Sequence, residues 1–454
     1  MSTAIRRYVR SLGLDAYIVG GAVRDELLGL AHADEDFLVP GVDQAGLRAA
    51  LEPHGRVEDM EVHGQLVGVR FYPRDRDIRP LVPSGIELTP PRAERSVGPG
   101  HRDFEIVADG SVSIEDDMAR RDFTVNAIAR RLATGELVDP FHGVGDLERR
   151  ELRTVSPESF REDPLRILRG LRLLSQLGFT LPEETLRQMR QEAAGLRHVS
   201  GERIGGGLAA DGMGELSKLL LGQRPRDALR IARDTGALVE VVPELGATIG
   251  YDLGSPRQPT TLDEHLLAVV QHAADAGAPL AVRLAALLHD LGKPAADATG
   301  GDHAQLGARI TGRVMRRLRY PNALRQEVVR LVAAHAFHLD GPVDDVFARR
   351  FLASHGRDGA RALLLHKRVD LAAKNVEPWE LDHLARLERG VDEQREAPYR
   401  LADLAVDGGD LLAIGYREGP ALGSELARLL DVVIDDPAAN ERDTLLELAR
   451  GALE

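Results

Sequence analysis

The chain has 454 residues, of which 43% are hydrophobic and 4% aromatic, and its formal net charge is −14. This length allows three or four domains, and the recurrence of leucine, alanine and arginine predicts a mainly helical protein. The absence of cysteine excludes disulfides, thiolate zinc sites and cysteine nucleophiles. No apolar run in the sequence approaches the ~20 residues of a membrane span, and no signal-peptide apolar region is evident, so we expect a cytoplasmic protein without a membrane partner.

The negative net charge argues against indiscriminate nucleic-acid binding, because proteins of that kind usually carry a basic excess. It is compatible with a local basic groove. Between residues 118 and 203 the arginines outnumber the acidic residues. A weakly acidic protein with one arginine-rich segment suits a folded RNA better than random DNA.

The stretch from Tyr17 to Pro40 is expected to contain a strand, a glycine turn, a short helix and a second strand. Tyr17–Val19 is β-branched and aromatic, and Gly20–Gly21 interrupts it where a backbone could approach a phosphate. Val23–Leu28 then has helical spacing. This order suits phosphate binding, although a GG pair is also common by chance.

Two carboxylates, Asp34 and Asp36, lie on the second strand of this stretch. Residues i and i+2 of a strand share a face and lie roughly 6–7 Å apart, so both could bind one hard cation or a close pair of cations. A glycine turn for phosphates and two acids for Mg²⁺ are what nucleotidyl transfer requires, because the metal neutralises the triphosphate and activates the attacking hydroxyl. The alternative is a solvated acidic strand edge.

The remainder of residues 1–140 is expected to combine helices and strands. Gln44–Leu51 has the pattern of a helix and Leu66–Phe71 that of a strand. Glu87 lies on the face of a short strand opposite its apolar neighbours, so it is either a third metal-binding carboxylate or an exposed strand acid. Residues 89–104 are rich in Pro, Gly and Arg and are expected to form a mobile loop.

The string GGAVRDELLG at residues 20–29, followed by DED at 34–36, resembles the head signature of class II tRNA nucleotidyltransferases and bacterial poly(A) polymerases, in the polymerase-beta superfamily. RRDFTVNA at residues 120–127 resembles that family's motif for ribose and triphosphate contacts, and adjacent arginines are bidentate donors to phosphate. The alternative is a solvated arginine pair followed by an asparagine cap. The residues that the resemblance implies for the triphosphate, the turn or the nucleotide are Gly20, Gly21, Arg24, Asp25, Arg120, Arg121, Asp122 and Asn126.

Two neighbouring segments resemble further parts of that family. Residues 89–104, with Arg92, Glu94 and His101, resemble its flexible loop, which in relatives helps the active site change its nucleotide preference. A plain surface loop is the alternative for each of these residues. DPFHGVGDL at residues 139–147 resembles the motif that joins head to neck, for which we expect a hinge or structural role.

Pro157–Phe179 is expected to form the main helix of the neck, with an ordinary apolar stripe on one face. Salt bridges within the helix are one explanation for the charges off that stripe. Base recognition is another: cytosine and adenine present an amino donor beside a ring-nitrogen acceptor, so Asp163 could accept from the first and Arg166 donate to the second. Uracil and guanine would leave buried groups unpaired. EDPLR at residues 162–166 resembles the family's EDxxR motif, to which this template role is assigned, and Arg169 is expected to bind nucleotide with it.

Beyond the neck helix the chain departs from the family. Five glycines at positions 205–207, 212 and 214 interrupt a segment that relatives keep as a continuous helix. We therefore expect a break there and carry over no site residue. Helical spacing resumes at Arg226–Glu244.

A linker at Gly250–Thr261 precedes a segment with His265, then His289–Asp290, then Asp370. This order resembles the ligands of the HD phosphohydrolase superfamily. Imidazoles with two carboxylates suit a divalent transition metal or Mg²⁺, which can activate water against a phosphoester. A vestigial HD fold that helps to bind RNA is the alternative. Other candidates are Lys293 for a phosphate, and His303 and His335 either for a second metal or as ordinary histidines.

The last segment is helical with alternating charge and resembles the family's tail, which in relatives holds the tRNA elbow. Trp379 and Tyr399 are expected to be core residues. The resemblance implies four domains: an α/β head with a mixed sheet at 1–140, then a helical neck and body at 141–250, an HD domain at 262–375 and a tail at 376–454.

The implied function is addition of C and A from CTP and ATP to tRNA 3′ ends. Mg²⁺ is expected at the head, and a divalent metal of the Mg, Mn, Ni or Co class at an HD centre with phosphohydrolase activity. Within this class, CC-only addition, A-only addition and poly(A) synthesis stay open, since these activities share most motifs. An HD phosphohydrolase with a non-catalytic, RNA-binding head is the alternative from another class.

Overall fold

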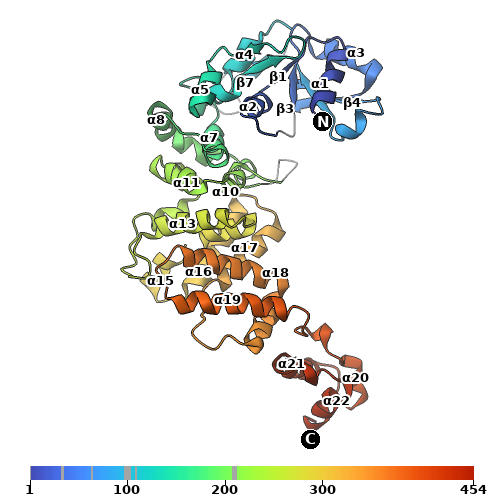
Figure 1. Ribbon diagram of the computed structural model, residues 1–454, viewed down its shortest axis with the longest axis vertical. Helices are drawn as coiled ribbons and strands as arrows, with labels where there is room; N and C mark the ends of the chain where they lie inside the picture. The colour runs from blue at the N-terminus through green and yellow to red at the C-terminus, as the bar shows by residue number, and fades with distance from the viewer. Residues whose placement is uncertain are drawn as a thin grey trace. The chain divides into compact units, whose positions relative to one another are not determined.

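The computed structural model describes residues 2–31, 35–62, 65–96, 104–107, 110–206 and 212–453, and it is drawn in Figure 1. The chain forms two compact units. The first contains Met1–Ile204 and Asp227–Val241, and the second contains Gly205–Arg226 and Val242–Glu454. The boundaries of the four domains expected from the sequence stay predictions.

A mixed sheet is the centre of the first unit, which confirms the α/β head. Within the described residues it has seven strands in the order β3-β4-β5-β2-β1-β8-β9. β2 and β5 are parallel, and the other neighbours are antiparallel. The strands are β1 (Tyr17–Val19), β2 (Asp36–Leu38), β3 (Gly55–Val62), β4 (Gln65–Pro73), β5 (Ile86–Thr89), β8 (Ala129–Arg131) and β9 (Leu137–Val138).

The register of the short central strands positions the candidate site. Val19, the last residue of β1, pairs with Asp36, the first residue of β2, and Asp36 in turn pairs with Glu87 of β5. Phe37 is buried and anchors β2 in the core, whereas Asp36 before it is exposed. The chain therefore leaves β1 through Gly20 at the same end of the strands at which β2, the acidic strand, begins.

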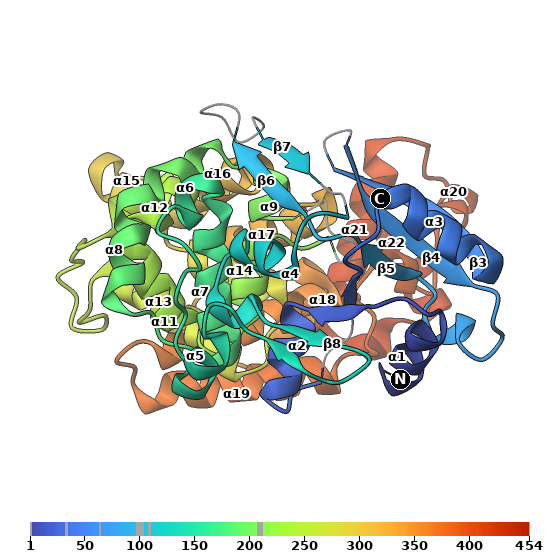
Figure 2. The same ribbon diagram turned by 90° about the horizontal axis from the view of Figure 1, so that it is seen from above.

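Helices pack on this sheet and continue into the neck. Ile114 and Met118 of α4 share a core cluster with Val19 and Leu38 of the central strands. α3 lies alongside β4, as Figures 1 and 2 both show. The helices of this unit are α1 (Ser2–Ser11), α2 (Gly21–Leu27), α3 (Gln44–Leu51), α4 (Ile114–Ala119), α5 (Gly143–Arg149), α6 (Ser159–Glu162), α7 (Leu165–Leu177), α8 (Glu183–Glu192), α9 (Gly201–Ile204), α11 (Pro225–Asp234) and α12 (Ala237–Val241).

The expectation of a loop throughout residues 89–104 is wrong in part. Ala93–Ser96 is strand β6, which pairs with β7 (Phe104–Val107) in a separate antiparallel ladder. Its partner lies at the far end of the Pro- and Gly-rich segment, and pairing satisfies the backbone groups that a loop would leave to water. Glu94 belongs to β6, and His101 lies outside the described residues.

The neck helix expected over Pro157–Phe179 is also divided. α6 ends at Glu162, and α7 begins at Leu165 after the pair Asp163–Pro164. Asp163 is extended, with φ −143° and ψ 98°, because a residue before proline is disfavoured in the helical region. The break therefore places Asp163 between the two helices and outside both.

The glycine-rich segment breaks the helix, as expected for the described residues. α9 ends at Ile204, and α10 (Glu215–Leu220) begins after Gly214. Gly207 lies outside the described residues. One helix therefore ends before the glycine-rich segment and another begins after it.

A helical bundle and a small tail make up the rest of the second unit (Figure 1). α14 is at the centre of the bundle: all but the first of its residues are buried, and it packs against α10, α13, α17 and α18. The tail has its own core around Leu429 and Leu445. The helices after α10 are α13 (Leu262–Asp275), α14 (Leu280–Leu288), α15 (Lys293–Thr299), α16 (His303–Arg317), α17 (Asn322–Ala334), α18 (Asp345–Ala372), α19 (Pro378–Glu393), α20 (Gly408–Ala413), α21 (Pro420–Asp435) and α22 (Arg442–Gly451).

The two aromatic residues predicted to be core differ in the structure. Tyr399 is buried, as predicted, but Trp379 is 42% exposed. Trp379 is the second residue of α19 and faces a cavity, so the prediction of a core role is wrong. Among the described residues, every helix is too short or too polar to span a membrane.

Two candidate active sites

The first candidate site is a basic cavity of about 460 Å³ in the first unit. Seven arginines and three aspartates line it, so its described walls carry a surplus of four positive charges. A cavity of this charge attracts anions such as a triphosphate. Its lining residues are Gly20, Gly21, Arg24, Asp36, Arg92, Arg120, Arg121, Asp122, Asn126, Asp163, Arg166, Arg169 and Arg172.

Gly20 forms the turn from β1 into α2, and two observations favour glycine there. Its φ of 69° lies in the region that favours glycine. A Cβ at this position would also stand 2.6 Å from Nη1 of Arg121. The glycine turn thus allows the guanidinium of Arg121 to lie directly against the backbone of Gly20.

Asp117 orients the arginine pair of the RRD motif. Its buried carboxylate accepts hydrogen bonds from Arg120 (Nη2 to Oδ1, 2.8 Å) and Arg121 (Nη2 to Oδ2, 3.1 Å), and from the backbone N–H of Arg92 (3.1 Å). Burial opposes ionisation, but the two guanidinium charges outweigh it and keep the pKa of Asp117 below its usual value. Sequence reasoning assigned this residue no role, although an acid three and four residues before two arginines was a usable signal.

Asp122 and Asn126 connect the motif to two other segments. The carboxylate of Asp122 accepts from Asn126 Nδ2 at 2.9 Å and from Arg169 Nε of α7 at 2.7 Å. Asn126 Oδ1 accepts from Arg24 Nη1 at 2.8 Å, and Arg24 also donates to Asp25. Burial would raise the pKa of Asp122, but Arg169 and Asn126 hold it well below its usual range. Five predicted residues therefore form one network, in which Asp25 supports Arg24 from outside the lining of the cavity.

Asp163 and Arg166, the predicted base-reading pair, both line the same cavity. Arg166 donates to the backbone carbonyl of Arg120 at 2.7 Å and to Glu162 at 2.9 Å, so its guanidinium is fixed against the arginine motif. Asp163 accepts from the backbone N–H of Leu165 at 3.1 Å and from Arg203 at 2.8 Å. The contact with Arg203 of α9 was not expected from the sequence.

The predicted metal-binding carboxylates of the head are placed in part. Asp36 lines the cavity, and Asp34 lies outside the described residues. Glu87 is the register neighbour of Asp36, but its carboxylate forms an ion pair with Arg70 of β4 and is not among the described lining residues. Asp36 is therefore the described carboxylate that is best placed to meet an ion beside a bound triphosphate.

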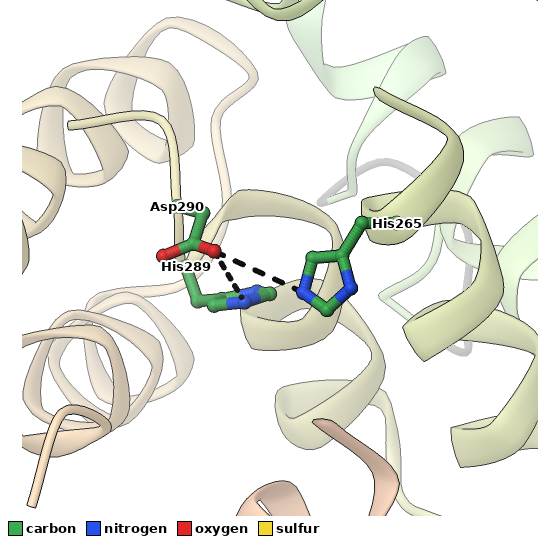
Figure 3. Close-up of side chains that lie close together, drawn as sticks. All are labelled: His265, His289 and Asp290. Atoms are coloured by element: carbon green, nitrogen blue, oxygen red, sulfur yellow. Dashed lines mark ion pairs between the residues drawn. The ribbon is translucent and has the colours of Figure 1, made fainter. Parts of the chain in front are cut away.

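The second candidate site is the HD cluster, formed by His265 of α13, the pair His289–Asp290 after α14, and Asp370 of α18. All four side chains are buried. His289 Nε2 lies 3.2 Å from Asp290 Oδ2, and His265 Nε2 lies 3.1 Å from Asp370 Oδ1. Figure 3 shows both imidazoles turned toward the carboxylate of Asp290. The predicted quartet is thus brought together from three helices.

The donors of the HD cluster fit a divalent cation. Ligands at ~2.1 Å from one ion lie about 3.0–3.5 Å from each other, which matches the shortest separations in the cluster. Several of the facing atoms, including His265 Nε2 and Asp370 Oδ1, are buried and have no hydrogen-bond partner within the described part of the chain. Burial would lower the pKa of His289, but Asp290 and Asp370 raise it to about 9, which reflects how strongly this centre favours a positive charge.

His366, one helical turn before Asp370 on α18, also belongs to this region and was missed from the sequence. Its ring is buried, and its centroid lies 5.0 Å from that of His289 and 5.9 Å from that of His335. Neither ring nitrogen has a hydrogen-bond partner among the residues that the structure describes. Burial lowers the pKa of His366 well below its usual value, so it is neutral at pH 7. Its i−4 spacing from Asp370 was the available signal.

A cavity of about 450 Å³ adjoins the HD cluster. Asp290 and Asp370 reach its wall, and so do the ammonium groups of Lys293 and Lys374, each 2.6 Å from one of these carboxylates. The predicted linker contributes to the wall as well, through residues that include Arg257. Lys293 is placed near the centre, as its predicted phosphate contact requires.

Known families and structures resemble this chain throughout. Family models match a poly A polymerase head domain at residues 16–153, a "probable RNA and SrmB-binding site of polymerase A" at 178–248 and an HD domain at 262–386. Fold and sites thus define a nucleotidyltransferase head joined to an HD metal-dependent phosphohydrolase domain.

The multifunctional CCA protein of Xanthomonas campestris pv. campestris is 35% identical over 432 residues, which cover 90% of this chain and 96% of the relative. That of Xylella fastidiosa is 37% identical over 326 residues, or 69% and 72%. This chain belongs to the multifunctional CCA protein family.

Solved structures agree with this fold. The Bacillus stearothermophilus CCA-adding enzyme in complex with CTP has a TM-score of 0.70 at 24% identity, over 100% of this chain and 96% of that one. The Thermotoga maritima CCA-adding enzyme complexed with tRNA has a TM-score of 0.58 at 19% identity, over 98% and 93%.

Proposed function

We infer that this chain is a tRNA nucleotidyltransferase that adds C and A, from CTP and ATP, to tRNA 3′ ends. The observation that carries this function is the arginine-lined cavity, which joins the glycine turn, the RRD motif and the EDxxR motif in one place. Relatives named multifunctional CCA proteins, and solved CCA-adding enzymes bound to CTP, ATP and tRNA, support the substrates.

We assign two tasks to the residues that line the cavity, namely binding of the nucleotide and binding of Mg²⁺. We assign binding of the triphosphate to Arg24, Arg120 and Arg121, which Asp25 and Asp117 hold, and binding of a sugar hydroxyl to Asn126. Asp36 would hold Mg²⁺ together with the predicted Asp34. The ion would supply charge neutralisation and a lower pKa for the attacking hydroxyl.

Base choice is assigned to Asp163 and Arg166. A carboxylate acceptor beside a guanidinium donor complements the Watson–Crick edges of cytosine and adenine, as the sequence predicts. Uracil and guanine present a carbonyl beside an N–H and would leave groups of the pocket unpaired. Arg169 supports this wall through its bond to Asp122.

Incorporation of labelled CTP and ATP, each alone and together, on tRNA transcripts that end at the discriminator base, at C and at CC, tests this function. We expect two C and one A, followed by arrest. Incorporation only on the CC-ended transcript, only of C, or as an unbounded A ladder would reassign the enzyme to A-only addition, CC-only addition or poly(A) synthesis. Asp36→Asn is expected to abolish incorporation, whereas Asp77→Asn, an exposed acid of the same unit, serves as the matched control.

The HD cluster supports a second activity, hydrolysis of phosphate esters at RNA ends. The observation that favours it is a buried His/Asp cluster beside a cavity with several cationic side chains. A divalent ion of the Mg, Mn, Ni or Co class would activate water there. Release of phosphate from a 3′-phosphorylated oligoribonucleotide is expected to vanish in His289→Ala and to persist in His338→Ala, an exposed histidine of the same cavity.

The two activities are proposed as separate. If Asp36→Asn left nucleotide incorporation intact, the head would be reduced to RNA binding and the HD centre would be the working enzyme. The cytoplasmic location expected from the sequence stays a prediction.

A further inference from the structure

A buried glutamine in the cavity of the HD bundle has an amide donor that the described residues leave without an acceptor. Gln258, in the linker before α13, is only 3% exposed and lines the cavity together with Lys293. Its Oε1 accepts from Lys293 Nζ at 3.4 Å, and since an ammonium group only donates, the amide oxygen faces the lysine. Nε2 then has no hydrogen-bond partner in the described part of the chain. Because an unpaired buried donor costs stability, a ligand that accepts from it is favoured.

The single tryptophan of the chain lines the same cavity. Trp379 lies in the first turn of α19, and 42% of it is exposed. The ring of His383, one turn later, packs against it in a T-shaped contact with the ring centroids 5.3 Å apart, and His383 Nδ1 is bonded to the carbonyl of Leu339 at 2.7 Å. The indole is thus supported by His383, while a large part of its surface stays open to a planar ligand.

An ion pair connects the segments that carry the amide and the indole. Arg257, the neighbour of Gln258, donates to both carboxylate oxygens of Glu380, with Nη1 2.8 Å from Oε1. Glu380 is the neighbour of Trp379 and is buried. Burial would raise the pKa of Glu380, but the hydrogen bonds from Arg257 hold it below its usual value, so the pair is ionised at pH 7. The linker and the first turn of α19 are therefore fixed to each other before a ligand binds.

We propose that this cavity binds the terminal nucleotide of an RNA, with the base stacked on Trp379 and an oxygen of the sugar phosphate bound by the amide of Gln258. The proposal rests on the phosphohydrolase activity proposed for the HD cluster, and it names the part of the substrate that the cavity recognises. A volume of about 450 Å³ is that of a small-molecule site. Because every nucleobase has a π-face, stacking on the indole would tolerate any of the four bases.

The amide of Gln258 lies next to the centre at which an ester would react. Lys293 Nζ is 2.6 Å from Asp290 Oδ2 and 3.4 Å from Gln258 Oε1, so one ammonium group connects the amide to the buried cluster. An oxygen of the reacting sugar phosphate is therefore the acceptor that suits this donor. A simple phosphate ester would leave the indole of Trp379 in water, whereas a base would cover its apolar surface.

The fluorescence of Trp379 tests the proposal directly, because the only tryptophan of the chain lines this cavity. The full-length protein in MgCl₂ is mixed with adenosine 3′-monophosphate by stopped flow, so that binding is recorded before hydrolysis. We expect saturable quenching by this nucleotide and none by glycerol 2-phosphate, which has no base. Gln258→Leu keeps the tryptophan and removes the donor, so half-maximal quenching should require about 10-fold more nucleotide.

The kinetics of phosphate release from a 3′-phosphorylated oligoribonucleotide give the second readout. Trp379→Ala is expected to raise KM by about 10-fold or more and to change kcat little, because stacking contributes to binding of the substrate. Trp379→Phe should restore most of the wild-type KM, since a phenyl ring also stacks on a base. Leu381→Ala is the matched control, because Leu381 is exposed on the same helix and is absent from the described lining of the cavity. All variants are compared with the wild type by circular dichroism.

Failure of this inference and failure of the phosphohydrolase activity are distinguishable. Wild-type KM in both Trp379→Ala and Gln258→Leu, together with unquenched fluorescence, would overturn recognition of the nucleotide, while release of phosphate would leave the hydrolytic activity standing. Equal quenching by glycerol 2-phosphate would overturn the role of the base. Quenching by adenosine 3′-monophosphate in a protein that releases no phosphate would support the nucleotide site and refute the phosphohydrolase activity.

Discussion

Single buried carboxylates organise the arginines of the head cavity. Asp117 accepts hydrogen bonds from Arg120 and Arg121, and Asp122 accepts one from Arg169, so each guanidinium keeps a defined direction before any nucleotide binds. Fixed donors of this kind cost little reorganisation when a triphosphate arrives. The residues that orient the cavity are therefore as important as those that touch its ligand.

Asp117→Asn is expected to lower the free energy of unfolding of the head by about 1–3 kcal/mol at pH 7, because the partly buried guanidinium groups of Arg120 and Arg121 lose the counter-charge that they share. The pKa of Asp117 is lower in the folded protein than in the unfolded chain. Its ionised form therefore stabilises the fold above about pH 4, and this contribution is lost as the pH falls through the lowered pKa.

Urea unfolding of wild type and Asp117→Asn at pH 7 and pH 3 measures this effect. The difference between the two proteins should be largest at pH 7. Glu115→Gln, an exposed acid of the same helix α4, is the control and should change stability at neither pH. A difference that grows toward pH 3 would contradict the role of Asp117.

Asp163→Asn is expected to change base choice, because it replaces one acceptor oxygen by an N–H₂ donor. Steady-state kinetics with CTP, ATP and UTP should show kcat/KM for CTP and ATP reduced by about 10²-fold or more, while the UTP value is unchanged or raised. Equal losses for the three nucleotides would mean that Asp163 supports the structure of the cavity and does not read the base.

At the scale of elements, close packing decides where a helix tolerates glycine. A Cβ on Gly170 of α7 would stand 2.6 Å from Cζ of Phe123, so α7 lies directly against the segment that carries the RRD motif. A Cβ on Gly312 of α16 would meet its nearest neighbour, Val329 Cγ2, at an ordinary 3.6 Å. Both glycines lie inside a helix, but only Gly170 is too closely packed to accept a Cβ without a shift of its neighbour.

Gly170→Ala is expected to destabilise the head by about 1–3 kcal/mol, because overpacking outweighs the gain in helix propensity. Gly312→Ala is expected to stabilise the HD bundle by about 0.5–1 kcal/mol, since only the propensity gain remains. Denaturant unfolding of both variants, followed separately for the two units, compares them. Stabilisation by Gly170→Ala would show that α7 can move away from Phe123.

At the scale of the whole molecule, a buried arginine joins the tail to the HD bundle. Arg349 of α18 donates to the backbone carbonyls of Ile434 and Asp435 at the end of α21, and to the side chain of Gln394. The side chain of its neighbour Arg350 forms an exposed ion pair with Asp435. Ile434 is buried, and a buried helix-terminal carbonyl needs such a donor, which makes Arg349 the stronger link.

Arg349→Met is expected to loosen the tail and cost about 1–3 kcal/mol, because the carbonyl of buried Ile434 loses its partner. Arg350→Met is the matched control, with an expected cost below about 1 kcal/mol. If the tail binds tRNA, as in the family that the sequence resembles, Arg349→Met should raise KM for tRNA but not for CTP. Limited proteolysis after residue 400 would report the loosening, and equal protection of both variants would contradict it.

The sequence by itself determined the class of the protein and most candidate residues. The glycine turn, the RRD and EDxxR strings and the H, HD, D order depend on short spacings, which a chain displays without folding. The same is true of β1 and α3, whose bounds were predicted as observed, because alternation and helical periodicity are local.

The tertiary structure decided what depends on contacts between distant residues. Strand β6 formed because its partner lies beyond the segment predicted as a loop, and Trp379 proved exposed because α19 borders a cavity. The placement of His303, His335 and His366 around Asp290 and its partners combines positions that are far apart in the chain. No spacing rule relates such residues, since only the packing of α14, α16, α17 and α18 brings their side chains close together.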